Sequence, residues 1–334
     1  MIIAGQEIKP GTRRSVNVPV VSLYTNTEVN MPVHVIRSKK PGPTVLVCAA
    51  IHGDELNGID IVRRLIHMKS LRLTCGSLVL VPMVNVYGVL DQSRYLPDRR
   101  DLNRAFPGSA KGSFAGRVAE QFMTEIVEVC DYGIDLHTGA IHRSNLPQIR
   151  ANLKDEETLR VARSFGVPVI LNAELRDGSL RQAGSEKGIR FLVYEAGQAL
   201  RFDEMSIRAG VRGVLNVLVA LDMKKPAKAK AKAEVTTPYI ANNSSWVRSS
   251  DSGIVSHHAQ LGDHVKAGEL LAMIRSPMGD VLEEVRASRD GIVIGKQNIP
   301  LTYEGEAMYH IAFFDENAEV ASSVDAIQQN GIVI

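Results

Sequence analysis

Short runs of β-branched and aliphatic residues alternate with segments of helical period between residues 43 and 222, and this alternation constrains the fold more than any other feature. The expected strands cover residues 43–50, 77–84, 132–136, 167–171 and 190–194. Apolar residues recur every three or four positions over 114–129 and 211–221, which predicts helices there. Strands and helices in alternation form a largely parallel sheet with helices on both faces. We therefore expect an α/β fold for this part of the chain.

The composition is that of a globular protein with more than one domain. The chain has 334 residues, of which 45% are hydrophobic and 23% charged, and its net charge is +2. A charge balance this close to neutral gives no reason to expect nucleic acid or a membrane as a partner. The sequence contains no run of roughly 20 apolar residues and no recognisable signal peptide. Its three cysteines lie far apart in apolar segments and are expected to be reduced, so we expect a cytoplasmic protein.

A lysine-rich segment of low complexity divides the chain. Five lysines fall between residues 224 and 232, and no aromatic residue lies among them. A solvated linker explains this composition better than a nucleic-acid or lipid patch, because no side chain that stacks on bases is interleaved with the charge. We expect a first domain over 1–223, a basic linker over 224–236 and a second domain over 237–334.

The second domain contains two related halves. Residues 252–255 return in similar form at 290–293, an offset of 38 residues, and a second pair of similar segments follows with an offset of 37. This repeat predicts two β units packed about a pseudo-twofold axis. The pattern resembles the lipoyl/biotinyl-type barrel-sandwich domain, whose signature is matched by residues 261–272. The tip between the halves has no lysine to modify, so we expect a covering or assembly module. An exposed strand edge in it is compatible with a homo-oligomer.

Side chains with metal-binding atoms follow the expected strands. His52 and Glu55 come directly after one apolar run, and His137 ends another. Because ligands gather at the carboxyl ends of parallel strands, we expect these side chains to lie near Glu195, which ends a third run. Two imidazoles and one carboxylate, with a fourth position open, are a common ligand set of catalytic zinc. Taken singly, each residue is as readily explained as a helix cap or a satisfied polar group.

The segment between these candidates is rich in arginine. Residues 93–108 contain four arginines, and the pair Asn103 and Arg104 is followed by Phe-Pro-Gly. A rigid turn of this kind would present an amide and a guanidinium, which together suit a carboxylate bound by parallel hydrogen bonds. A solvated basic loop is the alternative.

With these residues together, the chain resembles the succinylglutamate desuccinylase/aspartoacylase family, a group of zinc carboxypeptidase-like deacylases. The resemblance covers the catalytic part, roughly 40–222, and extends to the C-terminal β domain. Its motifs are H-G-D-E at 52–55, R-D-L-N-R at 100–104, D-L-H-T-G at 135–139 and Y-E-A-G at 194–197. The resemblance implies a zinc-carboxypeptidase-like, mixed and largely parallel sheet flanked by helices, followed by an all-β barrel-sandwich domain.

The same resemblance implies roles for individual residues. The ligands of one zinc ion per chain would be His52, Glu55 and His137. Glu195 would take a proton from zinc-bound water and pass it to the leaving amine, and its place after an apolar strand fits a partly desolvated base. Asn103 and Arg104 would bind the free carboxylate of the substrate.

Two more assignments follow from the resemblance. Arg94, which precedes a tyrosine upstream of the Asn-Arg pair, best matches the arginine that polarises the scissile carbonyl. The wider spacing in this chain leaves Arg99 and Arg100 as alternatives for that role. Tyr303 matches a tyrosine that the family's C-terminal domain lends to the substrate pocket, and a plain surface tyrosine is the alternative.

The leading hypothesis is therefore a zinc-dependent amidohydrolase that acts on a carbon–nitrogen bond other than a peptide bond. It would cleave a small N-acyl amino acid into a carboxylate and an amine. A metallocarboxypeptidase acting on short peptides is the first alternative. A metal-dependent binding or scaffolding protein, built around the C-terminal module, is the second.

Overall fold

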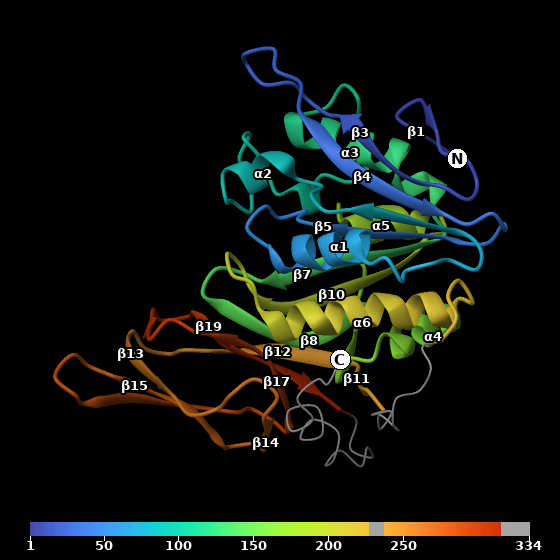
Figure 1. Cartoon of the computed structure of the whole chain (residues 1–334). Coiled ribbons are helices and arrows are strands. Elements are labelled where there is room, and N and C mark those ends of the chain that lie inside the picture. The colour runs from blue at the N-terminus through green and yellow to red at the C-terminus, as the bar shows by residue number, and fades with distance from the viewer. Residues whose placement is uncertain (227–236, 315–334) are drawn as a thin grey trace.

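Figure 1 shows the computed structural model of the chain, in which residues 1–226 and 237–314 are described. A central mixed sheet carries helices on both faces. Its strands in the N-terminal part are β3 (Arg13–Pro19), β4 (Asn30–Arg37), β5 (Thr44–Ala49), β6 (Ser77–Val81), β7 (Tyr132–Gly139), β8 (Arg143–Ala151), β9 (Val169–Asn172) and β10 (Arg190–Gln198). They follow the order β8-β10-β7-β5-β6-β4-β3, with β9 paired to β8. A small separate hairpin consists of β1 (Ile2–Ile3) and β2 (Gln6–Glu7).

The predicted α/β fold is confirmed. The five expected strands correspond to β5, β6, β7, β9 and β10. β5 runs parallel to both β6 and β7, and β10 runs parallel to β7. β8 runs antiparallel to β10, and β3 and β4 form an antiparallel edge, so the sheet is mixed. All residues of β5 are buried, because helices cover both of its faces.

Helices on the two faces bury separate apolar clusters. One face packs against α1 (Asn57–His67), α4 (Glu156–Phe165) and α6 (Glu204–Ala220). The other face packs against α2 (Val86–Leu90), α3 (Phe114–Glu125), the short turn η2 (Val127–Val129) and α5 (Leu180–Glu186). The helices expected over 114–129 and 211–221 are α3 and the second half of α6. Both begin at a capping side chain, since Ser113 accepts a hydrogen bond from the backbone of α3 and Asp203 from that of α6.

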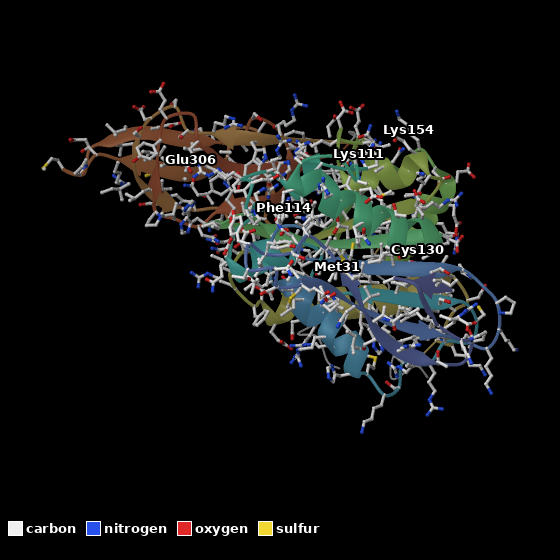
Figure 2. The ribbon with its side chains drawn as sticks, turned by 90° about the horizontal axis from the view of Figure 1, so that it is seen from above. Met31, Lys111, Phe114, Cys130, Lys154 and Glu306 are labelled. Carbon is white, nitrogen blue, oxygen red and sulfur yellow. The ribbon has the colours of Figure 1, made fainter. Side chains whose placement is uncertain are left out.

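The C-terminal strands extend the central sheet. They are β11 (Tyr239–Ala241), β12 (Asn243–Arg248), β13 (Gly253–His257), β14 (His264–Val265), β15 (Leu270–Arg275), β16 (Val281–Arg286), β17 (Gly291–Gln297), β18 (Leu301–Thr302) and β19 (Ala307–Phe313). β17 pairs with β8, and β11 pairs with β9. The view from above shows the C-terminal strands, one of whose loops carries Glu306, projecting from one end of the α/β part (Figure 2).

The strand pairing reflects the repeat seen in the sequence. The first half contributes β13, β14 and β15, and the second contributes β17, β18 and β19 in the same order. The two halves exchange their short strands, because β14 pairs with β17 while β18 pairs with β13. A buried apolar cluster lies between the two halves.

Residues 227–236 of the expected linker 224–236 fall outside the described residues. The described helices include none that is both long and apolar enough to cross a membrane. The three cysteines, Cys48, Cys75 and Cys130, form no disulfide, as expected.

Candidate active site

The candidate metal ligands come from two neighbouring strands. β5 ends at Ala49, and the loop after it carries His52 and Glu55 before α1 begins at Asn57. β7 pairs in parallel with β5 and carries His137 near its carboxyl end. The sheet thus brings together side chains that are far apart in the sequence, at the edge where ligands gather in such folds.

Sterics explain why the second position of the H-G-D-E motif, Gly53, is a glycine. A side chain at Gly53 would place its Cβ 1.9 Å from the carbonyl carbon of Gly88 in α2. The backbone of α2 therefore packs directly on the loop that carries His52 and Glu55. Only glycine allows this approach, and the approach fixes the path of the loop.

Glu55 lies between the two imidazoles. Its Oε1 is 2.7 Å from Nδ1 of His52, and its Oε2 is 2.8 Å from Nδ1 of His137. The three side chains are buried, and one ligand atom from each lies within 4.8 Å of the others. Two imidazole nitrogens and one carboxylate oxygen at this separation fit the three protein ligands of a catalytic zinc ion.

A further carboxylate lies beside the outer nitrogen of each imidazole. Nε2 of His52 is 3.1 Å from Oδ1 of Asp101, and Nε2 of His137 is 2.7 Å from Oδ2 of Asp135. Such carboxylates fix the ring orientation and tautomer of metal-binding histidines. Here they turn both Nδ1 atoms toward Glu55, so the arrangement fits the ion that the sequence predicted.

Charge pairing in the cluster overcomes the effect of burial. Burial lowers the pKa of His52, but the charge of Glu55 and the hydrogen bonds with Asp101 and Glu55 outweigh it, so this pKa is raised. Burial likewise lowers the pKa of His137, while Asp135 and Glu55 raise it well above its usual value. The two imidazoles lower the pKa of Glu55 despite its burial. Opposite charges thus favour the cluster, and a bound metal ion would compete with protons for the imidazole nitrogens.

Arg94 contacts this cluster through carboxylates. Its Nη2 and Nε donate to Oδ2 of Asp101 at 2.9 and 3.2 Å, and its Nη1 lies 3.5 Å from Oε1 of Glu55. The two alternatives, Arg99 and Arg100, have exposed side chains. The structure therefore brings Arg94, and neither of the other two, to the cluster.

Asn103 and Arg104 lie on the turn η1 (Leu102–Arg104), which Asp101 caps. Oδ1 of Asn103 accepts a hydrogen bond from the backbone of Leu180, which leaves its amide nitrogen as a donor. Arg104 is exposed, and its guanidinium donates to the Asn103 carbonyl. Because Asp101 also contacts His52, the turn adjoins the cluster.

Glu195 lies on β10 beside His137 of β7, its register partner in the parallel pairing. Its side chain is mostly buried, with 16% exposed. Nδ2 of Asn145 donates to its Oε2 at 2.8 Å, and Nε of Arg150 lies 3.9 Å from its Oε1. A general base for a metal-bound water would be expected on a carboxylate next to the candidate ligands.

Tyr303 is the candidate that the structure leaves apart from the cluster. It follows β18 in the C-terminal strands, and 79% of it is exposed. No hydrogen bond within residues 1–226 and 237–314 joins its hydroxyl to the other candidates. Its role in the substrate pocket stays a prediction.

Several residues at the site were not singled out in the sequence: Asp101, Asp135, Asn145 and Arg176. Asp135 carried a signal, because it lies two residues before His137 and so on the same face of β7. Arg176 lies close enough to help lower the pKa of Arg181, together with burial and Arg150, to about 10. Arg150 of this group approaches Glu195, and Arg176 lies near Arg104 of the turn η1.

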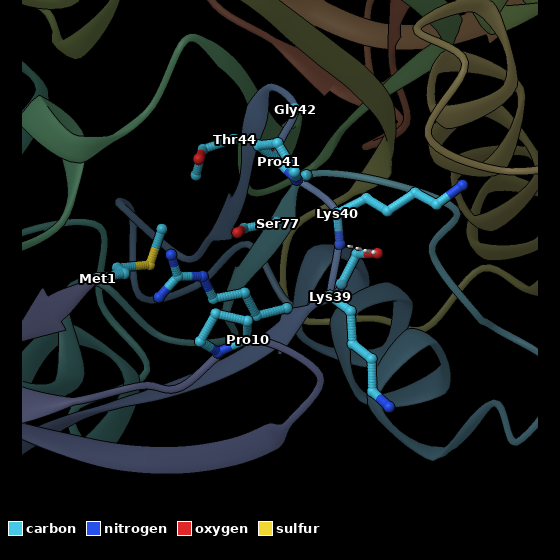
Figure 3. Close-up of a pocket in the computed structure, with 11 residues that line it drawn as sticks. Met1, Pro10, Lys39, Lys40, Pro41, Gly42, Thr44 and Ser77 are labelled. Atoms are coloured by element: carbon cyan, nitrogen blue, oxygen red, sulfur yellow. Dashed lines mark hydrogen bonds between the residues drawn. The ribbon is translucent and has the colours of Figure 1, made fainter.

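A cavity elsewhere in the molecule lies apart from the candidate ligands. About 250 Å³ of space lies at the starts of β5 and β6, at the opposite ends of these strands from His52 (Figure 3). Thr44 and Ser77 line it, and Lys39 and Lys40 extend away from them (Figure 3). It contains none of the candidate ligands, so we place the site at the cluster.

The family model of the succinylglutamate desuccinylase/aspartoacylase catalytic domain matches residues 41–221, more than half of the chain. The chain belongs to this family. The family resemblance predicted from the four motifs is thus confirmed, and the matched range contains the three candidate ligands, Glu195 and the Asn-Arg pair.

Individual relatives of this family member are similar over most of its length. A curated relative, the N-alpha-acetyl-L-2,4-diaminobutyric acid deacetylase of Halomonas elongata, is 29% identical over 281 residues, which are 80% of this chain and 81% of the relative. A succinylglutamate desuccinylase/aspartoacylase structure from Rhodobacter sphaeroides has a TM-score of 0.79 at 24% identity and covers 91% of this chain and 97% of that one. The product-bound ectoine utilization protein EutE (DoeB) of Ruegeria pomeroyi has a TM-score of 0.80 at 24% identity, with 92% and 96% covered. At these identities the two structures support the fold alone.

Proposed function

We propose that the chain is a zinc-dependent amidohydrolase that removes the acyl group from a small N-acyl amino acid. The observation that supports this most is the convergence of His52, Glu55 and His137 on one point, with Glu195 on the next strand. Membership of a family of deacylases supports the reaction class. The deacetylase relative, whose name gives a small N-acyl amino acid as its substrate, supports the size of the substrate.

Different residues of the chain carry out proton transfer, oxyanion stabilisation and substrate binding during amide hydrolysis. Glu195 accepts a proton from the attacking water and returns it to the leaving nitrogen, so that the amine departs neutral. Arg94 faces the developing oxyanion, and one such donor contributes roughly 3 to 4 kcal/mol in other hydrolases. Asn103 and Arg104 bind the substrate carboxylate and hold the scissile bond in place.

His52, Glu55 and His137 would hold one zinc ion, which when bound supplies a Lewis acid that acidifies water and polarises the carbonyl. Asp101 and Asp135 keep the two imidazoles oriented for this purpose. We also propose that Tyr303 contributes to the substrate pocket.

We further propose a domain organisation, a cellular location and a class of partner for the chain. We assign residues 1–223 to the catalytic unit, 224–236 to a linker and 237–334 to a barrel-sandwich module of the lipoyl type. The exchange of β14 and β18 between the halves supports that module. We also propose a cytoplasmic protein that acts on a small molecule, with no nucleic-acid or membrane partner, and a homo-oligomer as its assembled form.

A substrate panel tests the reaction class. N-acetyl and N-succinyl amino acids should be hydrolysed, whereas dipeptides and longer peptides should not. Glu195→Gln keeps the size of the side chain but removes the base, so it should bind zinc normally and lose turnover by about 10² to 10⁴-fold. Preferential cleavage of peptides would favour a metallocarboxypeptidase, and full turnover by the variant would reject Glu195 as the base.

A further inference from the structure

The strand β8 carries two side chains that meet the carboxylate of Glu195. β8 lies between β10, which bears Glu195, and β17 from the C-terminal strands. Asn145 donates through Nδ2 to Oε2 at 2.8 Å. Arg150 places Nε 3.9 Å from Oε1, too far for a hydrogen bond but near enough for charge attraction. The two oxygens of one carboxylate are thus approached by two different groups.

The position of Asn145 is fixed from the side of the C-terminal strands. Its register partner on β17 is Gly295. A Cβ at Gly295 would lie 3.1 Å from Oδ1 of Asn145 and 3.0 Å from Cβ of His310. The missing side chain therefore makes room for the amide of Asn145, which is itself buried with 7% exposed. Strand β17 confines the amide that holds the base.

Contacts within the fold do not explain the placement of Arg150 in the same way. Its Nε is buried and has no hydrogen-bond partner in the described part of the chain. A buried donor without a partner is unfavourable, and its occurrence in a folded protein calls for an explanation. The carboxylate nearest to this atom is Glu195.

We propose that Asn145 and Arg150 are positioning residues for the catalytic base, an inference that rests on the proposed function. Asn145 occupies Oε2 and fixes the plane of the carboxylate, so Oε1 is the oxygen that receives the proton from water and later gives it to the leaving nitrogen. Arg150 places its positive charge beside Oε1, which holds this oxygen in position through charge attraction. The C-terminal strands would influence catalysis through this contact between β17 and β8.

Variants of Asn145 that keep its volume separate positioning from packing. Asn145→Asp has the same shape but cannot donate to Oε2, and Asn145→Leu fills the same space without any donor. Each should lower kcat by about tenfold or more, because small misplacements of reacting groups are costly, with KM within about threefold of the wild-type value. Zinc content and melting temperature should change little. Arg190→Gln, on the same strand as Glu195 but paired with Asp155, is the control and should leave kcat unchanged.

A double-variant cycle ties the effect to Glu195. In the Glu195→Gln background, Asn145→Asp should cause no further loss, because residues that act as a unit are not additive. If Asn145→Asp and Asn145→Leu turn over within twofold of the wild type while Glu195→Gln is inactive, the positioning role is rejected and the proposed function stands. If Glu195→Gln itself is fully active, the proposed base is rejected first.

Arg150 gives an independent readout should the Asn145 variants lose zinc. Arg150→Lys keeps the charge and should retain most of kcat, whereas Arg150→Gln should lose about tenfold. Equal activity of the two Arg150 variants would contradict the inference.

Discussion

Glu55 is the residue on which the candidate centre depends. It contacts both imidazoles through separate oxygens, and it also accepts a hydrogen bond from the backbone of Thr138 at 3.0 Å. Its carboxylate is therefore fixed before any ion binds. Such preorganisation lowers the cost of assembling a metal site, because the ligand atoms need little rearrangement.

The carboxylate of Asp135 should control metal affinity without touching the ion. In Asp135→Asn the side chain loses its negative charge and can turn either an oxygen or an NH2 group toward His137 Nε2, so it no longer fixes the tautomer and orientation of the ring. We expect the zinc affinity to fall by about 10 to 100-fold, measured by competition with a chelator. Asp91→Asn, an exposed change at the end of α2, is the control. An unchanged affinity for Asp135→Asn would show that the second carboxylate has no such role.

His310 should make the protein less stable in acid. Burial, with a contribution from Arg150, lowers its pKa from 6.5 to about 3. As the pH falls below 6.5 the unfolded chain therefore takes up this proton first, and stability is lost until the pH reaches about 3. The loss is about 1.4 kcal/mol per pH unit within that window.

A comparison of variants isolates this contribution. His310→Phe retains an aromatic ring to stack on Trp246 but cannot titrate. Urea unfolding between pH 7 and pH 4.5 should show the wild type losing stability faster than His310→Phe, while His142→Phe at an exposed position behaves as the wild type does. Parallel curves for the wild type and His310→Phe would contradict the assignment.

At the scale of elements, the loop between β5 and α1 is held by close packing. Because a Cβ at Gly53 would lie 1.9 Å from the backbone of α2, Gly53→Ala must displace the loop that carries two candidate ligands. We expect a loss of about 1 to 3 kcal/mol in the free energy of unfolding, together with weaker zinc binding. Gly116→Ala is the matched control, since its nearest heavy atom would be 3.4 Å away and the residue lies within α3. Normal zinc binding by Gly53→Ala would show that the loop tolerates the shift.

The sequence predicted the elements whose apolar pattern is regular and missed those whose pattern is interrupted. β5 and β10 were visible as apolar runs. β8 was not, because it contains Pro147 and buries the polar side chains of Asn145 and Gln148. The candidate metal ligands could be located for a related reason: each lies near the carboxyl end of a recognisable strand or just after it. The contacts of Asn145 and Arg150 with Glu195 depend on the antiparallel pairing of β8 with β10, and that pairing has no local signal.

At the scale of the whole molecule, β8 and β9 join the two parts of the chain. Leu146, Val169 and Leu171 form a buried cluster with residues of β11, β17 and β19. The expected boundary at residue 223 therefore divides the chain at a point where the two parts share a sheet and an apolar core. Sequence composition indicates the lysine-rich segment, but it carries no information about this shared core.

Removal of the C-terminal part should consequently damage the catalytic part. A fragment of residues 1–223 would expose the edge of β8 and the apolar residues that β11 and β17 cover. We expect it to aggregate or to lose cooperative unfolding, measured by light scattering and by circular dichroism during urea titration. A soluble fragment with a sharp transition would show that the first 223 residues fold independently.

The metal content of the purified protein, measured together with its activity, decides whether His52, Glu55 and His137 hold a catalytic zinc ion. We expect about one zinc ion per chain by elemental mass spectrometry. Hydrolysis of an N-acyl amino acid should be lost on chelation and restored by added zinc, but not in a His137→Ala variant. Hydrolysis that persists at full rate in the metal-free protein, or zinc that binds equally well without His137, would contradict it.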